Sequence, residues 1–138
     1  WKMDRFYDLL EQSDVVMICA PLTAETEGMF DEQAFARMRS HAILINVTRG
    51  KIVNEKALVA ALRKGKIGGA GLDVTEPEPI PMDHPLLTLP NVVISPHIGS
   101  ASLDTRTEMA VLAARNILAR LKGESMPTCL NPEVLTLP

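Results

Sequence analysis

The sequence contains little cysteine, few aromatic residues and no excess of positive charge. Two of its 138 residues are cysteine, and aromatic residues make up 4% of the chain. Cys19 and Cys129 cannot build a disulfide framework and show no metal-ligand spacing, which favours buried or idle thiols in a reducing cytoplasm. The net charge is −3, and Lys and Arg are scattered along the chain. The sequence therefore lacks the basic surface that is typical of nucleic-acid binding.

Long apolar runs and several well-known catalytic motifs are also missing. No run approaches the roughly 18 apolar residues that a membrane-spanning helix needs, and no basic leader precedes a hydrophobic stretch. No Gly-x-Gly-x-x-Gly precedes a helix, and there is no Walker motif, no Gly-x-Ser-x-Gly and no His-Glu-x-x-His. These absences give no support to a kinase or a hydrolase, and they predict neither a metal site nor a membrane partner.

What is present is a regular alternation of short apolar runs and helical spacing. The runs at 15–19, 42–47, 68–74 and 92–94 are typical of strands. Between them, helices are expected after the capping residues Asp4, Asp31 and Asn54, and a long helix is expected to begin near Ser102. Because the strands show no polar alternation and helices separate them, we predict an α/β fold with a parallel sheet covered on both faces.

Unusual residues follow each predicted strand, at 20–23, 48–50, 73–79 and 95–99. Ligands of open parallel sheets bind outside the carboxyl ends of the strands, so we expect a site there. Leu22 and Thr23 could border a flat aromatic ligand such as adenine, although a turn of this kind is also common without a ligand.

Arg49 follows the second strand and precedes Gly50, which permits a sharp turn. A guanidinium at this point could bind a carboxylate or a carbonyl oxygen through two parallel hydrogen bonds. The alternative is a surface arginine paired with a nearby glutamate. Position at a strand end supports the first interpretation, and both stay open on the residues alone.

His97 follows the fourth strand, and imidazole is the usual proton donor or acceptor near neutral pH. The alternative is a histidine bonded within its loop, which is the role we expect for His41 and His84.

Asp73 and Glu78 lie in the loop after the third strand, and a carboxylate beside an imidazolium stabilises the protonated form. Alternatively, these acids only keep a proline-rich loop solvated.

Several strings of residues together resemble the D-isomer-specific 2-hydroxyacid dehydrogenases. They are Asn46-Val47-Thr48-Arg49-Gly50, Gly71-Leu72-Asp73-Val74 with Glu78-Pro79, and Ser95-Pro96-His97-Ile98-Gly99-Ser100, in the family's order and spacing. Ser13-Asp14-Val15-Val16 and Ala20-Pro21-Leu22-Thr23 match upstream. The resemblance covers the chain to about residue 127, and the segments 73–85 and 96–101 are most similar to glyoxylate/hydroxypyruvate reductases.

The resemblance implies roles for three catalytic residues. Arg49 would bind the carboxylate and carbonyl of a 2-oxo acid, and His97 would protonate the carbonyl oxygen as hydride arrives from NADH or NADPH. Glu78 would hold His97 protonated. The implied cofactor contacts are Pro21, Leu22, Thr23, Val47, Thr48, Arg49, Asp73, His97 and Gly99, with Asp73 at the nicotinamide carboxamide.

The resemblance also implies a domain organisation. Residues 1–101 would form the second half of a Rossmann-type, doubly wound NAD(P)-binding domain, and 102–138 a long helix and tail returning to a substrate domain. The chain would thus be part of a longer, homodimeric enzyme and inactive when isolated. The alternatives are a dinucleotide-sensing, corepressor-like module without catalysis and a phosphoglycerate dehydrogenase. The residues within these motifs are most similar to those of the reductases and favour that interpretation.

Overall fold

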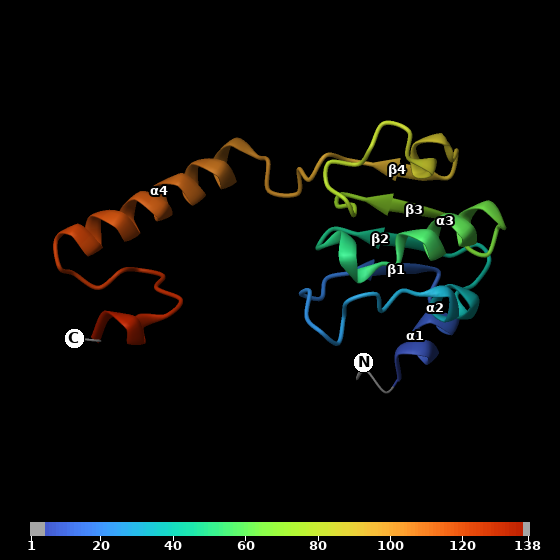
Figure 1. The fold of residues 1–138 in the computed structure, drawn as a ribbon, viewed down its shortest axis with the longest axis horizontal. Helices are drawn as coiled ribbons and strands as arrows, with labels where there is room; N and C mark the ends of the chain where they lie inside the picture. Colours follow the sequence, from blue (N-terminus) through green and yellow to red (C-terminus); the bar gives the residue numbers. More distant parts are fainter. Residues whose placement is uncertain (1–4, 137–138) are drawn as a thin grey trace. The chain divides into compact units, whose positions relative to one another are not determined.

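The computed structural model describes residues 5–136, and the chain divides into two compact units, one up to Gly99 and one from Ser100 (Figure 1). The first unit alternates strands with helices, as predicted. Its elements are α1 (Phe6–Gln12), β1 (Val15–Ile18), α2 (Glu32–Arg37), β2 (Ile43–Asn46), α3 (Glu55–Arg63), β3 (Gly69–Leu72) and β4 (Val92–Ile94), with short 3-10 turns at Gly50–Ile52 and Pro85–Thr88.

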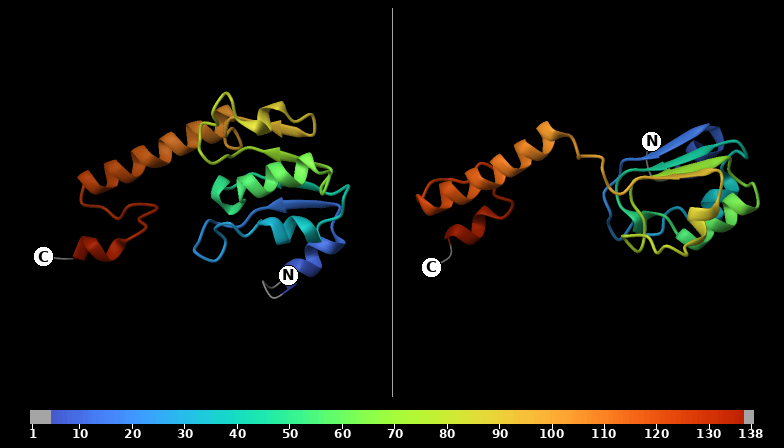
Figure 2. Two further views of the ribbon diagram at one scale, coloured as in Figure 1. Left: turned by 45° about the vertical axis from the view of Figure 1, so that its right-hand side comes forward. Right: turned by 90° about the horizontal axis from the view of Figure 1, so that it is seen from above.

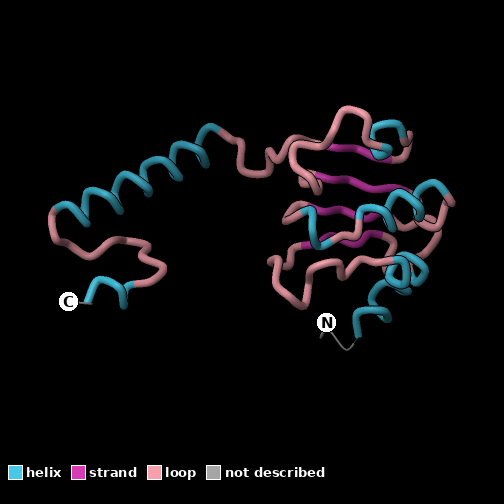
Figure 3. Tube along the Cα trace, in the orientation of Figure 1, coloured by secondary structure: helices cyan, strands magenta, loops and turns pink. Residues whose placement is uncertain are grey.

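The four strands form one parallel sheet in the order β1-β2-β3-β4 (Figure 3). Val16 pairs with Leu44, Leu44 with Ala70, and Ala70 with Val92, so the strands are in register and their carboxyl ends reach the same edge. The predicted α/β fold with a parallel sheet is confirmed.

Two of the predicted helix starts in this unit are confirmed by their capping bonds. The side chain of Asp31 accepts a hydrogen bond from the Ala34 amide, and that of Asn54 accepts one from the Ala57 amide. These bonds satisfy amides that the first turn of a helix leaves without a partner. Asp4 lies outside the described residues.

The core lies between one face of the sheet and the helices α2 and α3, which lie on the same side of it (Figure 2). Phe35, Leu44 and Leu58 are fully buried there. The prediction of a sheet covered on both faces is wrong for this unit. Val15 and Met17 are 55% exposed and Val93 is 74% exposed, because none of the described helices up to Gly99 packs on the second face.

The second unit consists of α4 (Leu103–Leu121) and a tail that contains a 3-10 turn at Pro132–Thr136. The Ser102 side chain accepts a hydrogen bond from the Thr105 amide and caps the helix, as predicted. The Asn116 amide group holds the tail by donating to the Thr128 hydroxyl and accepting from the Thr128 amide. None of the helices in residues 5–136 is long and apolar enough to cross a membrane.

Candidate active site

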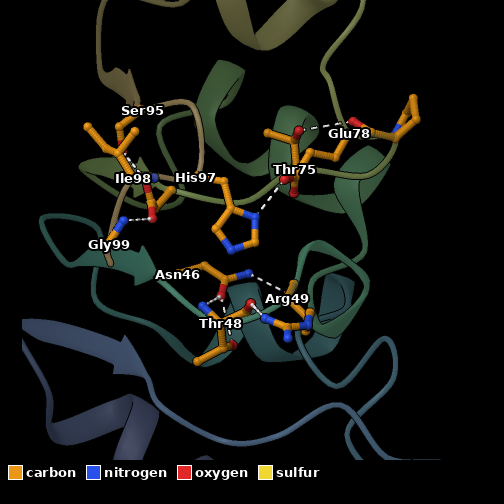
Figure 4. Close-up of polar contacts among 11 residues, drawn as sticks. Asn46, Thr48, Arg49, Thr75, Glu78, Ser95, His97, Ile98 and Gly99 are labelled. Atoms are coloured by element: carbon orange, nitrogen blue, oxygen red, sulfur yellow. Dashed lines mark hydrogen bonds and ion pairs between the residues drawn. The ribbon is translucent and has the colours of Figure 1, made fainter. Parts of the chain in front are cut away.

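The carboxyl ends of β2, β3 and β4 are joined by backbone hydrogen bonds that continue past the strands. The Asp73 amide donates to the Asn46 carbonyl at 2.9 Å, and the Ser95 amide donates to the Leu72 carbonyl at 2.8 Å. The loops that contain Arg49, Asp73 and His97 therefore begin side by side at one edge of the sheet (Figure 4). These are three of the four segments that were selected from the sequence, and the structure brings them together.

Arg49 lies in a turn that the side chain of Asn46 organises. The Asn46 amide nitrogen donates to the Arg49 carbonyl at 2.9 Å, and its oxygen accepts from the amide and the hydroxyl of Thr48, both at 3.1 Å. The Arg49 guanidinium donates to the Thr48 carbonyl at 2.7 Å. Arg49 is exposed, so a substrate could reach its remaining donors.

Gly50 is required by a close approach of two loops. A Cβ atom at this position would lie 2.1 Å from the Thr75 carbonyl oxygen, inside van der Waals contact. The Arg49 turn thus packs directly on the backbone that leads to Glu78. Gly50 does not have a positive φ, so this close approach, and not the sharp turn expected from the sequence, explains why a glycine stands here.

His97 pairs with Glu78. The distance between His97 Nδ1 and Glu78 Oε1 is 2.6 Å, and both side chains are partly exposed. In Figure 4 the imidazole extends toward the side of the site where Thr48 and Arg49 lie. Within the described residues Nε2 has no hydrogen-bond partner, so this nitrogen is open toward a ligand.

The loop around His97 is fixed by Asp73. His97 has a φ of 54°, and it is the one non-glycine residue with a positive φ among residues 5–136. Asp73 accepts hydrogen bonds from the Ser95 hydroxyl at 2.5 Å and from the amides of Ile98 and Gly99 at 2.9 and 2.8 Å. These bonds hold the backbone on both sides of His97.

The Asp73 carboxylate is 8% exposed and stays ionised. The hydrogen bond from Ser95 lowers the pKa of Asp73 most, the Ile98 and Gly99 amides and the charge of His97 lower it further, and burial opposes them. A carboxylate has about four acceptor positions, and three are used here. One acceptor position thus remains for a donor group of a ligand.

The segment after β1 forms an ordered turn. The Thr23 amide donates to the Thr26 hydroxyl at 2.8 Å, and the Thr26 hydroxyl donates to the Pro21 carbonyl at 2.7 Å. The Thr23 hydroxyl donates to Glu25, and this bond lowers the pKa of the Glu25 carboxyl. The turn leaves Leu22 exposed beyond the strand.

These residues fit part of a dinucleotide. Leu22 and Val47 are exposed apolar side chains beyond the ends of β1 and β2, where a planar ring can pack. At the end of β3, Asp73 offers its remaining acceptor position to an amide donor, and Gly99 has no side chain to obstruct it. No group of three or more His, Cys, Asp or Glu side chains in residues 5–136 could hold a metal ion.

Some features of the site were not assigned from the sequence. Asn46 and Ser95 belong to the motif strings but received no role, although a buried asparagine at the end of an apolar run is itself a signal. His41 and His84 also pair with carboxylates, those of Asp14 and Glu55, at 2.8 and 2.7 Å. All three histidines of the chain therefore have an acidic partner.

The chain is similar to a known protein family and to characterised members of it. The D-isomer specific 2-hydroxyacid dehydrogenase, NAD binding domain, matches residues 1–99. The chain is 52% identical over 126 residues to glyoxylate/hydroxypyruvate reductase B of Escherichia fergusonii, and 52% identical over 121 residues to the human glyoxylate reductase/hydroxypyruvate reductase. These alignments cover 91% and 88% of the chain and 39% and 37% of those relatives. The chain thus spans about two fifths of their length.

Solved structures share the fold. A protein from Thermus thermophilus superimposes with a TM-score of 0.88 at 49% identity, over 91% of this chain and 40% of that one. An NADPH-dependent glyoxylate/hydroxypyruvate reductase from Sinorhizobium meliloti, in complex with NADP and malonate, superimposes with a TM-score of 0.83 at 38% identity. That match covers 89% of this chain and 38% of that one.

Proposed function

The chain belongs to the D-isomer specific 2-hydroxyacid dehydrogenase family, and on that premise we propose that it is the coenzyme-binding and proton-donating part of a 2-oxo acid reductase. The reaction is the NADH- or NADPH-dependent reduction of glyoxylate or hydroxypyruvate to the D-2-hydroxy acid, and its reverse. The observation that carries the proposal is the pairing of His97 with Glu78 at 2.6 Å, at the edge of the sheet that also holds Arg49.

Arg49 binds the substrate. A guanidinium can donate two parallel hydrogen bonds, one to the substrate carboxylate and one to the oxo group. These two bonds orient the carbonyl carbon. They also place the positive guanidinium beside the carbonyl oxygen, which becomes negative during reduction. The bond from Arg49 to the Thr48 carbonyl uses only one of its five N–H groups, so the others are available.

His97 supplies the proton. The Nδ1–H group donates to Glu78, and the Nε2–H group donates to the carbonyl oxygen of the substrate. Glu78 favours the imidazolium because its negative charge lies next to the positive ring. As the carbonyl becomes a hydroxyl, the Nε2 proton moves to oxygen and His97 is left neutral. The bound dinucleotide supplies the hydride that completes the reduction.

The residues that follow the strands would hold the cofactor. Pro21, Leu22 and Thr23 would border the adenine end, and Val47, Thr48 and Arg49 follow the end of the neighbouring strand β2. Asp73, His97 and Gly99 would lie at the nicotinamide end, where the remaining acceptor position of Asp73 would receive the carboxamide N–H₂. We assign none of these residues to the 2′ position of the adenosine ribose, so the proposal includes both NAD and NADP.

We also propose a setting for the chain in a larger protein. Residues 1–101 complete the coenzyme-binding domain, and 102–138 run back to a substrate domain. The exposed apolar side chains of α4, such as Leu103, Met109 and Leu121, support a partner for this helix. The complete enzyme is proposed to be a homodimer in the cytoplasm, where Cys19 and Cys129 stay as the free thiols described here.

A turnover assay of the complete protein tests the proposal. Glyoxylate and hydroxypyruvate are each offered with NADH and with NADPH, and cofactor oxidation is followed by absorbance. We expect turnover of at least one substrate with one cofactor, and none from residues 1–138 alone. If the complete protein binds the dinucleotide but reduces neither acid, the proposal fails in favour of a dinucleotide-sensing module.

A further inference from the structure

Asn46 is the most deeply buried of the polar side chains for which burial is described. It is 1% exposed, and it lies at the carboxyl end of β2 in a run of otherwise apolar residues. A buried amide is costly unless its donors and acceptors are paired, so its partners indicate what it holds in place. All three hydrogen bonds of this side chain go to the turn that contains Arg49.

The bonds from Asn46 restrain Arg49 at two points. Its amide nitrogen donates to the Arg49 carbonyl, which fixes the backbone of the arginine. Its oxygen holds the amide and hydroxyl of Thr48, and the Thr48 carbonyl in turn accepts from the Arg49 guanidinium. Both the backbone and the charged end of Arg49 are thus connected to Asn46, directly or through Thr48 (Figure 4).

Asn46 is also connected to the loop of His97. Its backbone carbonyl accepts from the amide of Asp73, and the Asp73 carboxylate holds Ile98 and Gly99, which follow His97. Asn46 is therefore bonded both to the turn of Arg49, which would bind the substrate, and to the segment that holds the loop of His97, which would protonate the substrate.

We propose that Asn46 is a positioning residue that sets the orientation of Arg49 relative to His97, and hence the affinity for the 2-oxo acid. This inference rests on the proposed function, because the 2-oxo acid is the substrate proposed there for Arg49. An amide is required because one side chain must donate to the Arg49 carbonyl and accept from Thr48 at once. Aspartate has the same shape but, when ionised, only accepts, and serine is too short to reach both partners.

The test uses Asn46→Asp and Asn46→Ser in the complete protein, with oxamate as an unreactive analogue of a 2-oxo acid. We expect oxamate affinity and the KM for glyoxylate to worsen about 10- to 100-fold, because a small displacement of a binding group is costly. Dinucleotide affinity should stay within about 3-fold of wild type, because the Asn46 side chain bonds only to the Arg49 turn. Asn91 provides the matched control, because its amide donates to the Gly68 carbonyl at 3.3 Å. Asn91→Asp and Asn91→Ser should leave oxamate affinity unchanged.

A pH series separates positioning from general damage to the fold. In Asn46→Asp, protonation of the new carboxyl restores an O–H donor for the Arg49 carbonyl, so oxamate affinity should partly recover as the pH falls. Asn46→Ser carries no titratable group, and it should show no such recovery relative to wild type. Recovery in both variants, or an equal loss of oxamate and dinucleotide affinity, would overturn the inference.

Amide hydrogen exchange gives a readout that does not depend on turnover. The Thr48 amide donates to the Asn46 oxygen, so its exchange should accelerate in Asn46→Ser, which is too short to hold both partners, and stay slow in Asn46→Asp, which keeps the acceptor, and in the Asn91 variants. If wild type proves inactive but Thr48 loses protection as expected, the proposed function fails and the restraint by Asn46 stands. If Thr48 exchange and oxamate affinity are both unchanged, the inference is wrong. Should Asn46→Asp fail to fold, Asn46→Ser decides alone.

Discussion

A histidine paired with a carboxylate lies at each of the two edges of the parallel sheet, but the surroundings of the two pairs differ. At the amino edge, the Asp14 carboxylate lies 2.8 Å from His41 and 2.7 Å from Arg39, and all three side chains are exposed. At the carboxyl edge, Glu78 lies 2.6 Å from His97. By distance alone, both pairs look equally able to hold a protonated imidazole.

The edges differ in what fixes the backbone around the pair. Beside His97, the buried Asp73 carboxylate accepts two backbone amides and holds a residue with positive φ, and the buried Asn46 fixes the neighbouring Arg49 turn. Around His41, the described side-chain contacts are exposed: the ion pairs of Asp14 with His41 and Arg39, which contribute little to stability, and a hydrogen bond from Arg39 to the Glu11 carbonyl. A histidine–carboxylate pair is thus a common surface feature, and the buried polar anchors next to it distinguish the candidate active site.

The largest expected effect comes from removing each imidazole. In the complete protein, His97→Gln should lower the rate of 2-oxo acid reduction by about 10²- to 10⁴-fold, because the general acid is lost. His41→Gln removes the other pair and should leave the rate within about 2-fold of wild type. Steady-state kinetics with glyoxylate checks both. A near-normal rate in His97→Gln would mean that His97 matters no more for the reaction than His41, and that His97 is not the proton donor.

The sequence predicted the carboxyl edge better than the amino edge. Strands were visible as apolar runs, and Asp31, Asn54 and Ser102 were recognisable as caps, because these signals are local. The rule that ligands bind at the carboxyl ends of parallel strands then selected the loops of Arg49 and His97.

Pairs formed by distant residues were harder to predict. Asp14 and His41 are separated by 27 positions, and no spacing rule connects them. The anchoring role of Asp73 depends on amides 25 and 26 positions away. Coverage of the sheet was also mispredicted: apolar residues such as Val15 and Met17 suggested a second covered face, but in the first unit both are 55% exposed, because an apolar run does not show which element packs on it.

A smaller effect is expected from changing the carboxylate that faces each imidazole. Glu78→Gln replaces a charged acceptor 2.6 Å from His97 Nδ1 with a neutral amide, so the ring is held less firmly and kcat/KM for glyoxylate should fall about 10-fold. Asp14→Asn is the matched change at the amino edge and should leave kcat/KM unchanged. Steady-state kinetics measures both. An unchanged kcat/KM in Glu78→Gln would contradict the role of Glu78.

The smallest effect concerns acid stability, and it compares Asp73 with Asp14. The hydrogen bond from Ser95 lowers the pKa of Asp73 most, and the one from His41 lowers the pKa of Asp14 most. A carboxyl with a lowered pKa in the folded state stabilises the protein above its ordinary pKa of about 4, and this stability is lost as the pH falls through the lowered value. Ser95→Ala and His41→Gln should therefore each reduce stability at neutral pH, and each difference should shrink as the pH falls below about 4.

Salt distinguishes these two carboxylates. Asp14 is exposed, so about 0.5 M NaCl should screen its pairing and remove most of the His41→Gln effect. Asp73 is buried under neutral donors, so the Ser95→Ala effect should persist in the same salt. Native-state amide exchange of Leu44, a core residue of β2, measures both differences in the complete protein. Equal salt sensitivity in the two variants would mean that Asp73 is no better shielded from salt than Asp14.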